Sequence, residues 1–441
     1  MAEPCIRLVL GNGINKKAPN PIVTETLPVL IMSHSAMPNG VHKQLRYIPL
    51  RYDNDCSEKS ALALVFDLRP EWEHSEGPIE IVKFKDGITN TLLKIVKKIP
   101  KKSTEQIDDE AILLRAYGNN TDILIDRDRE AQSHGLLAER GLAPPLLARF
   151  DNGLLYNFIQ GRVCTPHDLI KENVWRAVAR RLGEWHSVPL PDNYYRETVT
   201  NGVNGAYANG HTPAKNKPTP NIWTVMQKWI DALPKDTSAA QSRKSQLQAE
   251  LDRSFRDLDS VGCSEGHGMI FGHCDLLSAN VIILPNGRTT NAANGSESET
   301  VRFIDYEYAT ACPAAFDVAN HFAEWGGYDC DYTMLPSQSV RTSFLKEYLR
   351  AVTVWPRDVN LKEDMVQDML KQVDDFRGIP GLYWGIWALI QATISQIDFD
   401  YASYAEVRLG EYFAWREETD GIRKAEGREM PLRERCWARL E

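Results

Sequence analysis

Three polar residues, spaced along two apolar stretches of the chain, have the side chains that phosphoryl transfer needs. Asp275 and Asn280 lie in residues 271–280, and Asp305 ends the apolar run 301–304. A carboxylate and an amide oxygen suit Mg²⁺, a hard cation that keeps several waters and takes few protein ligands. A second carboxylate can accept the proton of an attacking hydroxyl. We therefore expect Asp275 to be the catalytic base, or the residue that orients the hydroxyl, and Asn280 and Asp305 to bind magnesium, in a transfer from ATP to a small alcohol.

The spacing of these residues has a simpler explanation as well. Asp and Asn are common in β-turns, so the pattern from His273 to Asn280 is equally consistent with an ordinary turn. Asp305, at the end of a second strand, favours the kinase interpretation, because kinases need a second acid there. We expect His273 to hydrogen-bond backbone near the loop and Cys274 to pack.

The residues before this segment predict a small β-rich lobe. Apolar runs at 79–84, 91–97 and 111–117 indicate two to three antiparallel strands. A helix is predicted within 127–140, and Gly141 suits the position just after a helix end.

Two features of this lobe could bind the phosphates of a nucleotide. The turn at 86–90 could cover phosphates with its backbone N–H groups, although an ordinary hairpin turn explains it equally well. Arg115 lies on the third strand, where kinases place a cation that pairs with the phosphates, and Glu130 would be its partner. The alternative for Arg115 is an exposed arginine on a strand.

A second, mainly helical lobe is predicted to follow a buried strand at 154–159. We place the boundary at Gln160 and Gly161. Thr165 and Asp168 form a capping signature with Pro166 at the first helical position, and the helix is expected to run to Trp185. Its predicted buried face holds Ile170, Val174, Val178, Leu182 and Trp185.

Four further segments have helical patterning: 316–325, 343–349, 364–376 and 382–399. Asp317 and His321 share one face of the first of these. Capping or locking the lobe explains this pair as well as catalysis does.

Trp384, Trp387 and Tyr404 are suited to enclose an ammonium group through cation–π contacts. Plain core packing is the alternative, because tryptophans three residues apart on a helix usually pack in a core. Glu324 could face a cationic substrate.

Composition limits the class of protein. The chain has 441 residues, a formal net charge of −9 and eight cysteines without a C-x-x-C pair. We expect a cytoplasmic protein with reduced thiols, no stable membrane insertion and no nucleic-acid binding. The polar stretches 198–220 and 286–300 are expected to be loops, the second one a hairpin tip.

Several motifs together resemble the choline/ethanolamine kinase family. They are residues 272–280, 303–308, 316–325 and 383–392, with 86–90 and 124–127. The resemblance implies an α+β, bilobal protein-kinase-like fold, with a small antiparallel β-rich N-lobe at 79–160 and a larger, mainly helical C-lobe at 161–441. Residues 1–78 would be an N-terminal extension, of a kind found in fungal members.

The resemblance also implies roles for individual residues. Asp275 would be the catalytic aspartate, with Asn280 and Asp305 on magnesium. The nucleotide would be bound by Asn90, Arg115, Glu130, Asn157 and Ile159, and the amine by Glu324, Trp384, Trp387 and Tyr404.

The substrate implied is an amino alcohol, and ethanolamine is preferred. Choline kinases usually carry Gln where Leu277 stands, whereas the Asp-Leu-Leu string here is more similar to ethanolamine kinases. The aromatic residues leave choline, or both amines, as an alternative. An aminoglycoside-type phosphotransferase and a non-catalytic scaffold are more distant alternatives, and a homodimer stays open.

Overall fold

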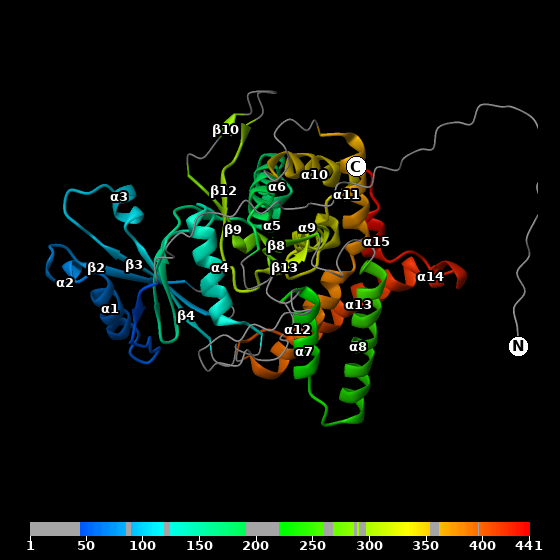
Figure 1. Ribbon diagram of the computed structural model, residues 1–441, viewed down its shortest axis with the longest axis horizontal. Helices are drawn as coiled ribbons and strands as arrows, with labels where there is room; N and C mark the ends of the chain where they lie inside the picture. The colour runs from blue at the N-terminus through cyan, green and yellow to red at the C-terminus, as the bar shows by residue number, and fades with distance from the viewer. Residues whose placement is uncertain are drawn as a thin grey trace, which may run out of the picture.

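A six-stranded sheet forms the smaller of two lobes in the computed structural model (Figure 1). The structure describes residues 45–84, 90–118, 124–190, 220–259, 268–285, 289–290, 297–352, 361–395 and 397–441. The strands occur in the order β1-β5-β6-β4-β3-β2, and every pair is antiparallel except β1 with β5. Their bounds are β1 (Tyr47–Ile48), β2 (Ile79–Lys83), β3 (Asn90–Lys97), β4 (Ile112–Tyr117), β5 (Leu146–Phe150) and β6 (Gly153–Asn157).

The predicted strands of this lobe are confirmed, and two more join them. Apolar side chains of β3, β4 and β6 form one core, because alternate residues of a strand face the same side of the sheet. The sequence prediction missed β5, a short run directly after two prolines, and β1, which lies in the segment 1–78. The turn at 86–89 lies outside the described residues.

Part of the segment 1–78 packs against this sheet. Ile48, Leu64 and Trp72 are buried in the same core as the central strands. Lys97 of β3 is also buried, and its Nζ donates hydrogen bonds to the carbonyl oxygens of Trp72 at 2.7 Å and Ser75 at 2.9 Å. The helices of this lobe are α1 (Ser57–Leu68), α2 (Glu71–His74), α3 (Thr104–Asp109) and α4 (Arg127–Glu139).

The helix predicted at 127–140 is α4, and Gly141 follows it with a φ of 69°. This left-handed conformation suits glycine after a helix end. Figure 1 shows α4 between the sheet and the helical lobe.

The single helix predicted from Thr165 to Trp185 is wrong, because the chain forms two helices there. The capping box is present: Thr165 accepts from the Asp168 backbone N–H, and Asp168 accepts from that of Thr165. It caps only α5 (Pro166–Leu169), after which Lys171 has an extended backbone and α6 (Glu172–His186) begins. Ile170 therefore falls between the helices and is exposed, whereas the other predicted core residues of α6 are buried.

The larger lobe is mainly helical. Its remaining long helices are α7 (Ile222–Ala232), α8 (Ser238–Asp259), α9 (Ala314–Ala323), α10 (Gln338–Ala351), α11 (Glu363–Phe376), α12 (Ile379–Ile394) and α13 (Tyr401–Thr419), followed by the short α14 (Ile422–Ala425) and α15 (Leu432–Trp437). In the part of the chain that the structure describes, none of the helices combines the length and apolar character needed to cross a membrane.

Short strands of the larger lobe carry the site. They are β7 (Arg162–Val163), β8 (Met269–Gly272), β9 (Val281–Ile283), β12 (Val301–Phe303) and β13 (Thr310–Pro313). β9 and β12 pair antiparallel, and β10 (Thr289–Thr290) pairs with β11 (Glu297–Ser298) farther out. This pairing agrees with the hairpin predicted around 286–300, of which residues 286–288 and 291–296 lie outside the described chain, as do residues 198–219.

The last predicted helix begins and ends earlier than expected. α12 starts at Ile379, with Pro380 in its first turn, and stops at Ile394 rather than at residue 399. It packs very closely on α13: a Cβ at Gly381 would lie 2.6 Å from the Arg408 carbonyl oxygen, and one at Gly385 would lie 2.6 Å from a Leu409 side-chain carbon. We call these two glycines the glycine contact.

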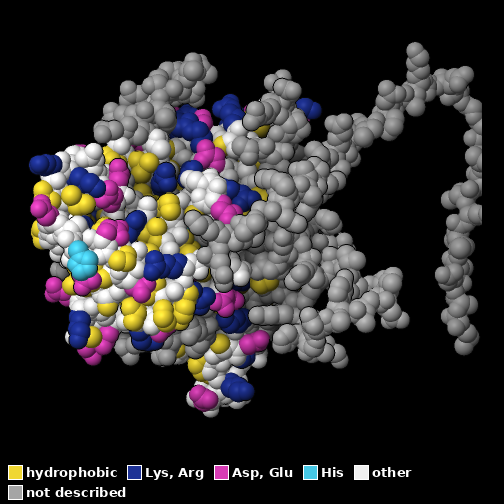
Figure 2. All heavy atoms as spheres, turned by 60° about the vertical axis from the view of Figure 1, so that its left-hand side comes forward, with side chains coloured by type: hydrophobic (Ala, Val, Ile, Leu, Met, Phe, Trp, Pro, Cys, Tyr) yellow, Lys and Arg dark blue, Asp and Glu magenta, His cyan; other side chains and the backbone are white. Residues whose placement is uncertain are grey.

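The outer side of the smaller lobe has mixed character. Figure 2 shows Lys and Arg side chains interspersed there with Asp and Glu and with exposed apolar side chains. Tyr47 and Val82, on the two edge strands, are 58% and 48% exposed.

Candidate functional site

A cavity of about 280 Å³ lies between the two lobes, and most of the predicted site residues line it. Ten of the predicted residues do so: Asn90, Arg115, Ile159, Asp275, Asn280, Asp305, Glu324, Trp384, Trp387 and Tyr404. Glu130 and Asn157 do not line it. Glu130 is buried behind Arg115, and Asn157 directs its backbone N–H to the Pro145 carbonyl, 3.1 Å away.

Strand pairing explains why the three polar residues converge. Asp275 follows β8, and Asn280 ends a short 3₁₀ turn directly before β9. Because β9 pairs with β12 in the register Val281 to Phe303, the next residues along β12 return toward Asn280, whose carbonyl accepts from the Ile304 N–H at 3.0 Å. Asp305 is thereby brought beside Asn280.

Asn280 is held by the residue that we expect to be catalytic. Its Nδ2 donates to the Asp275 carbonyl oxygen at 2.8 Å and to Asp275 Oδ2 at 3.1 Å. The amide nitrogen is therefore used within the loop, and the amide oxygen is the atom that Asn280 can offer to a cation. This donor set, an amide oxygen beside the Asp305 carboxylate, fits magnesium.

Negative charge accumulates at Asp275. Burial, together with the nearby carboxylates of Asp305, Glu324 and Glu307, raises the pKa of Asp275 well above its ordinary value. The hydrogen bond from Asn280 acts in the opposite direction. A raised pKa makes the ionised carboxylate a better proton acceptor.

Asp317 anchors the loop that carries Asp275. Its Oδ1 accepts from the Cys274 backbone N–H at 2.7 Å, and its Oδ2 accepts from the N–H of His273 and from His186 Nε2, both at 2.8 Å. Of the two roles considered for Asp317, these bonds favour the structural one. The Nε2–H of His273 donates to the Ile304 carbonyl oxygen, 3.1 Å away, as predicted for a residue that bonds backbone near the loop.

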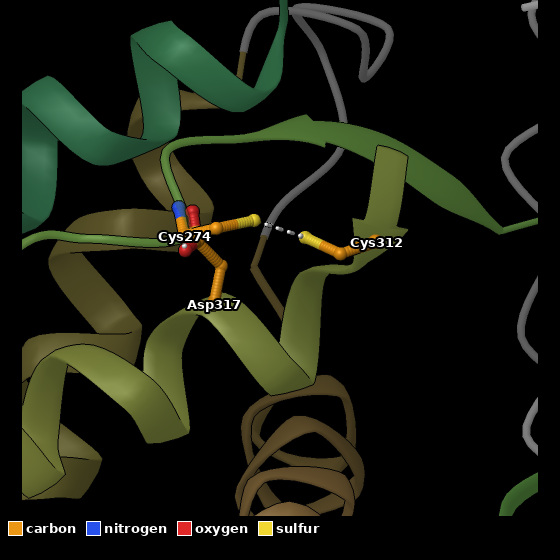
Figure 3. A group of neighbouring side chains, drawn as sticks. All are labelled: Cys274, Cys312 and Asp317. Atoms are coloured by element: carbon orange, nitrogen blue, oxygen red, sulfur yellow. Dashed lines mark hydrogen bonds between the residues drawn. The ribbon is translucent and has the colours of Figure 1, made fainter. Parts of the chain in front are cut away.

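Two thiols lie next to Asp317, as Figure 3 shows. The Sγ atoms of Cys274 and Cys312 are 3.7 Å apart, and one ligand atom from each of the three residues falls within 4.8 Å of the others. Both oxygens of Asp317 are already hydrogen-bonded, and burial raises the pKa of Cys274, which keeps the thiol protonated. Because metals bind the thiolate, we assign this cluster to support of the loop.

The backbone is strained at two positions of the site. Cys274 has a φ of 60° and Asp305 a φ of 67°, values that residues with a side chain adopt rarely. Such strain persists where the surroundings hold it and is concentrated at functional sites.

A buried group of charges lies on the nucleotide side of the cavity. Arg115 Nη1 lies 3.3 Å from Glu130, so the predicted ion pair is present, and the side chain is only 6% exposed, which excludes the exposed-arginine alternative. Arg115 Nη2 lies 2.7 Å from Asp305 Oδ1, although the orientation of these atoms does not form a hydrogen bond.

Two members of this charge group, Glu307 and Arg127, were missed by the sequence prediction. Glu307 accepts hydrogen bonds from Arg115, from Asn90 at 3.1 Å and from Arg127 at 3.1 Å. The signal was available in part, since Glu307 follows Asp305 by only two residues and lies in the motif 303–308.

Aromatic side chains form the other end of the cavity. The rings of Trp384 and Trp387 are nearly perpendicular, with centroids 5.5 Å apart. Each indole N–H donates a hydrogen bond within the protein, that of Trp384 to Asn320 Oδ1 at 2.8 Å and that of Trp387 to the Tyr308 hydroxyl at 2.7 Å. Tyr308 and Tyr328 also line the cavity and were not predicted.

Asn320 joins this aromatic end to the catalytic loop. Its Oδ1 accepts from Trp384, and its Nδ2 donates to the Cys274 carbonyl oxygen at 3.1 Å, while the side chain is fully buried. Both hydrogen-bonding ends of the amide are therefore used, one toward the aromatic end of the cavity and one toward the catalytic loop.

We expect Asn320→Leu to lower the free energy of unfolding by about 2–4 kcal/mol, because it leaves a buried donor and a buried acceptor unsatisfied. Urea unfolding measures the change. Asn173→Leu is the control, since the Asn173 side chain is half-buried and, in the part of the chain that the structure describes, donates to Glu299 at 3.1 Å. Equal losses for the two variants would contradict the assigned connection.

Comparison with known proteins gives a consistent result. Residues 81–413 match the family described as Choline/ethanolamine kinase. Ethanolamine kinase 1 of Mus musculus is 31% identical over 375 residues, which cover 83% of this chain and 91% of the relative. Ethanolamine kinase of Drosophila melanogaster is 35% identical over 322 residues, which cover 71% of this chain and 55% of the relative.

Solved structures have the same architecture. An ethanolamine kinase of Plasmodium vivax superposes with a TM-score of 0.58 at 25% identity, covering 80% of this chain and 88% of the other. A choline kinase of Cryptosporidium parvum also gives a TM-score of 0.58, at 20% identity, and covers 83% of this chain and 97% of the other. Together with the sheet lobe and the helical lobe, they confirm the predicted bilobal fold.

Proposed function

The chain belongs to the choline/ethanolamine kinase family, and on this premise we propose that it is an ethanolamine kinase. It would transfer the γ-phosphoryl group of ATP to the hydroxyl of ethanolamine and produce phosphoethanolamine for phospholipid synthesis. The observation that carries this proposal is that Asp275, Asn280 and Asp305 share one cavity with an aromatic and acidic pocket. The relatives named above support the choice of ethanolamine.

Each end of the cavity would bind one substrate. The nucleotide would lie against Ile159 and the smaller-lobe strands, with its phosphates near Arg115 and Asn90. Glu130 would orient Arg115 from behind, and Asn157 would fix the segment that leads to Ile159. The ammonium group would lie at the aromatic end, near Glu324.

Asp275 would accept the proton of the substrate hydroxyl as its oxygen attacks the γ-phosphorus. Hydrogen bonds between the loop and the side chains of Asn280 and Asp317 hold this carboxylate in place. Most of the rate acceleration would therefore come from the positioning of the reacting groups. Asn280 and Asp305 would hold magnesium, which supplies neutralisation of the charge that develops on the phosphates.

The pocket contains chemistry that favours a primary ammonium. Such a group donates hydrogen bonds to carboxylates, whereas a quaternary ammonium cannot. Glu324 and Asp275 both line the cavity and could accept them, and Leu277, on the same loop, adds an apolar wall. Choline would depend more on the aromatic rings of Trp384, Trp387 and Tyr404. Because these rings are present, choline or dual activity is the second candidate.

The test is a steady-state assay with ATP, Mg²⁺ and a panel of amino alcohols. We expect kcat/KM for ethanolamine to exceed that for choline, with no turnover once magnesium is removed by a chelator. A higher kcat/KM for choline than for ethanolamine would show that choline is the preferred substrate. If no amino alcohol were turned over while the nucleotide still bound, the protein would instead be a non-catalytic scaffold.

We also propose a cytoplasmic location. Among the described residues the six cysteines are free, which suits a reducing compartment. A homodimer stays a prediction, and so does the absence of nucleic-acid binding.

A further inference from the structure

Glu324, the acidic residue of the aromatic pocket, has a buried arginine as its partner. Glu324 lines the cavity, and its Oε1 accepts a hydrogen bond from Arg408 Nη2 at 3.0 Å. Arg408 lies on α13, does not line the cavity and has a side chain that is 1% exposed. It therefore contacts Glu324 from the protein side and leaves the other side of the carboxylate to face the cavity.

Arg408 is itself held by a second acid on the same helix. Its Nε lies 3.4 Å from Glu411 Oε2, one helical turn further along α13. A further donor of Arg408, Nη1, lies 3.9 Å from Cys330 Sγ. The guanidinium is thus fixed by groups on three sides, which suits the rigid, planar donor pattern of arginine.

The alternation of charges continues to the last helix of the chain. Glu411 lies 3.9 Å from Arg433 of α15, and Arg433 lies 3.1 Å from Glu434. Glu434 in turn pairs with Arg377 at 2.8 Å. A continuous buried series of alternating charges therefore leads from the amine pocket to α15, which lies beyond the residues that match the family, 81–413.

We propose that Arg408 is a positioning residue for amine recognition: it keeps the carboxylate of Glu324 ionised and aimed at the ammonium group of the substrate. This inference rests on the proposed function. Glu411 and Arg433 hold Arg408 in place, so α15 contributes to substrate binding without contacting the substrate.

The physical reason is the cost of an isolated buried charge. Glu324 is only 6% exposed, and a buried carboxylate without a counter-ion takes up a proton instead of staying ionised. A neutral carboxyl group loses the charge that attracts an ammonium. The nucleotide end of the cavity contains none of these residues, so it should be unaffected.

The experiment compares Arg408→Gln with Arg416→Gln. Arg416 lies on the same helix, is also buried and pairs with Asp257 at 2.8 Å, and neither residue lines the cavity. We expect the KM for ethanolamine to rise roughly tenfold to hundredfold in Arg408→Gln, with the KM for ATP changed by less than about threefold. Arg416→Gln should lose comparable thermal stability while keeping the wild-type KM for ethanolamine.

Methylguanidine added to Arg408→Gln should restore part of the affinity for ethanolamine. The dissociation constants for ethanolamine, measured by calorimetric titration, should rank the variants in the same order as their KM values. If Arg408→Gln does not fold, Glu411→Gln gives the same comparison, with a smaller rise in the KM for ethanolamine expected. Equal changes of both KM values, or a lower kcat with unchanged KM for ethanolamine, would overturn the proposal. Absence of ethanolamine turnover in the wild-type protein would instead reject the proposed function itself.

Discussion

Asp275→Asn should lower kcat by roughly a thousandfold or more while ATP still binds, because an amide cannot accept the proton of the hydroxyl. Asparagine has nearly the same shape as aspartate and retains an oxygen that can accept the hydrogen bond from Asn280. In the wild-type protein this bond joins Asn280 Nδ2 to Asp275 Oδ2 at 3.1 Å. The loop should therefore keep its place. A coupled assay of ADP release measures turnover, and calorimetric titration with ATP and Mg²⁺ measures nucleotide binding.

Asp128→Asn is the matched control for this substitution. Asp128 is exposed and, among the described residues, forms an ion pair with Arg149. The Asp128→Asn variant should therefore be as active as the wild-type protein. Residual activity above a few per cent of wild type in Asp275→Asn would show that another group accepts the proton. Loss of nucleotide binding in the same variant would instead indicate that the loop has collapsed.

Arg115→Met is expected to be the most destabilising single substitution among those considered, at about 3–5 kcal/mol of unfolding free energy. Arg115 is in ion-pair contact with Glu130, Glu307 and Asp305, and its removal leaves three acids with Arg127 as the remaining arginine of the group. Uncompensated buried charges are costly. The KM for ATP should rise as well, because the same side chain lines the nucleotide end of the cavity.

Two comparisons separate this expectation from a general loss of packing. Arg149→Met removes an exposed pair and should cost about 0–1 kcal/mol. Combining Arg115→Met with Glu130→Gln should be less destabilising than the sum of the two, by about 0.5–3 kcal/mol, since one unpaired acid is neutralised. Strictly additive losses in urea unfolding would argue against an interacting charge group.

The catalytic half of the site could be predicted because its residues are set by local features. Asp275 and Asn280 lie on one short loop, and Asp305 follows a strand that pairs with the strand after that loop. Once the apolar runs that become β9 and β12 are interpreted as a hairpin, the register of the hairpin brings Asp305 beside Asn280. The strand alternation of the smaller lobe and the end of α4 shortly before Gly141 are predictable for the same reason.

The missed features depend on contacts between distant parts of the chain. Glu307 meets Arg115 across 192 residues, and Arg408 meets Glu324 across 84, distances over which no periodicity in the sequence extends. The break after α5 was missed because Ile170 fits the helical spacing, whereas the observed chain ends the helix at Leu169 and leaves Ile170 exposed. Ile48 and Trp72 belong to the sheet lobe because they are buried in its core, and this burial cannot be predicted from the pattern of residues along the sequence.

The glycine contact between α12 and α13 limits how this enzyme could acquire new substrates. Trp384 and Trp387 lie on one of these helices and Tyr404 on the other, and the glycines leave no free space between the two backbones. Neither helix can therefore be drawn closer, and any side chain larger than hydrogen at Gly381 would collide with the Arg408 carbonyl oxygen and force the helices apart. Selection for bulkier amines should accordingly shorten an aromatic side chain, while selection for tighter discrimination has no room to act through the helix pair.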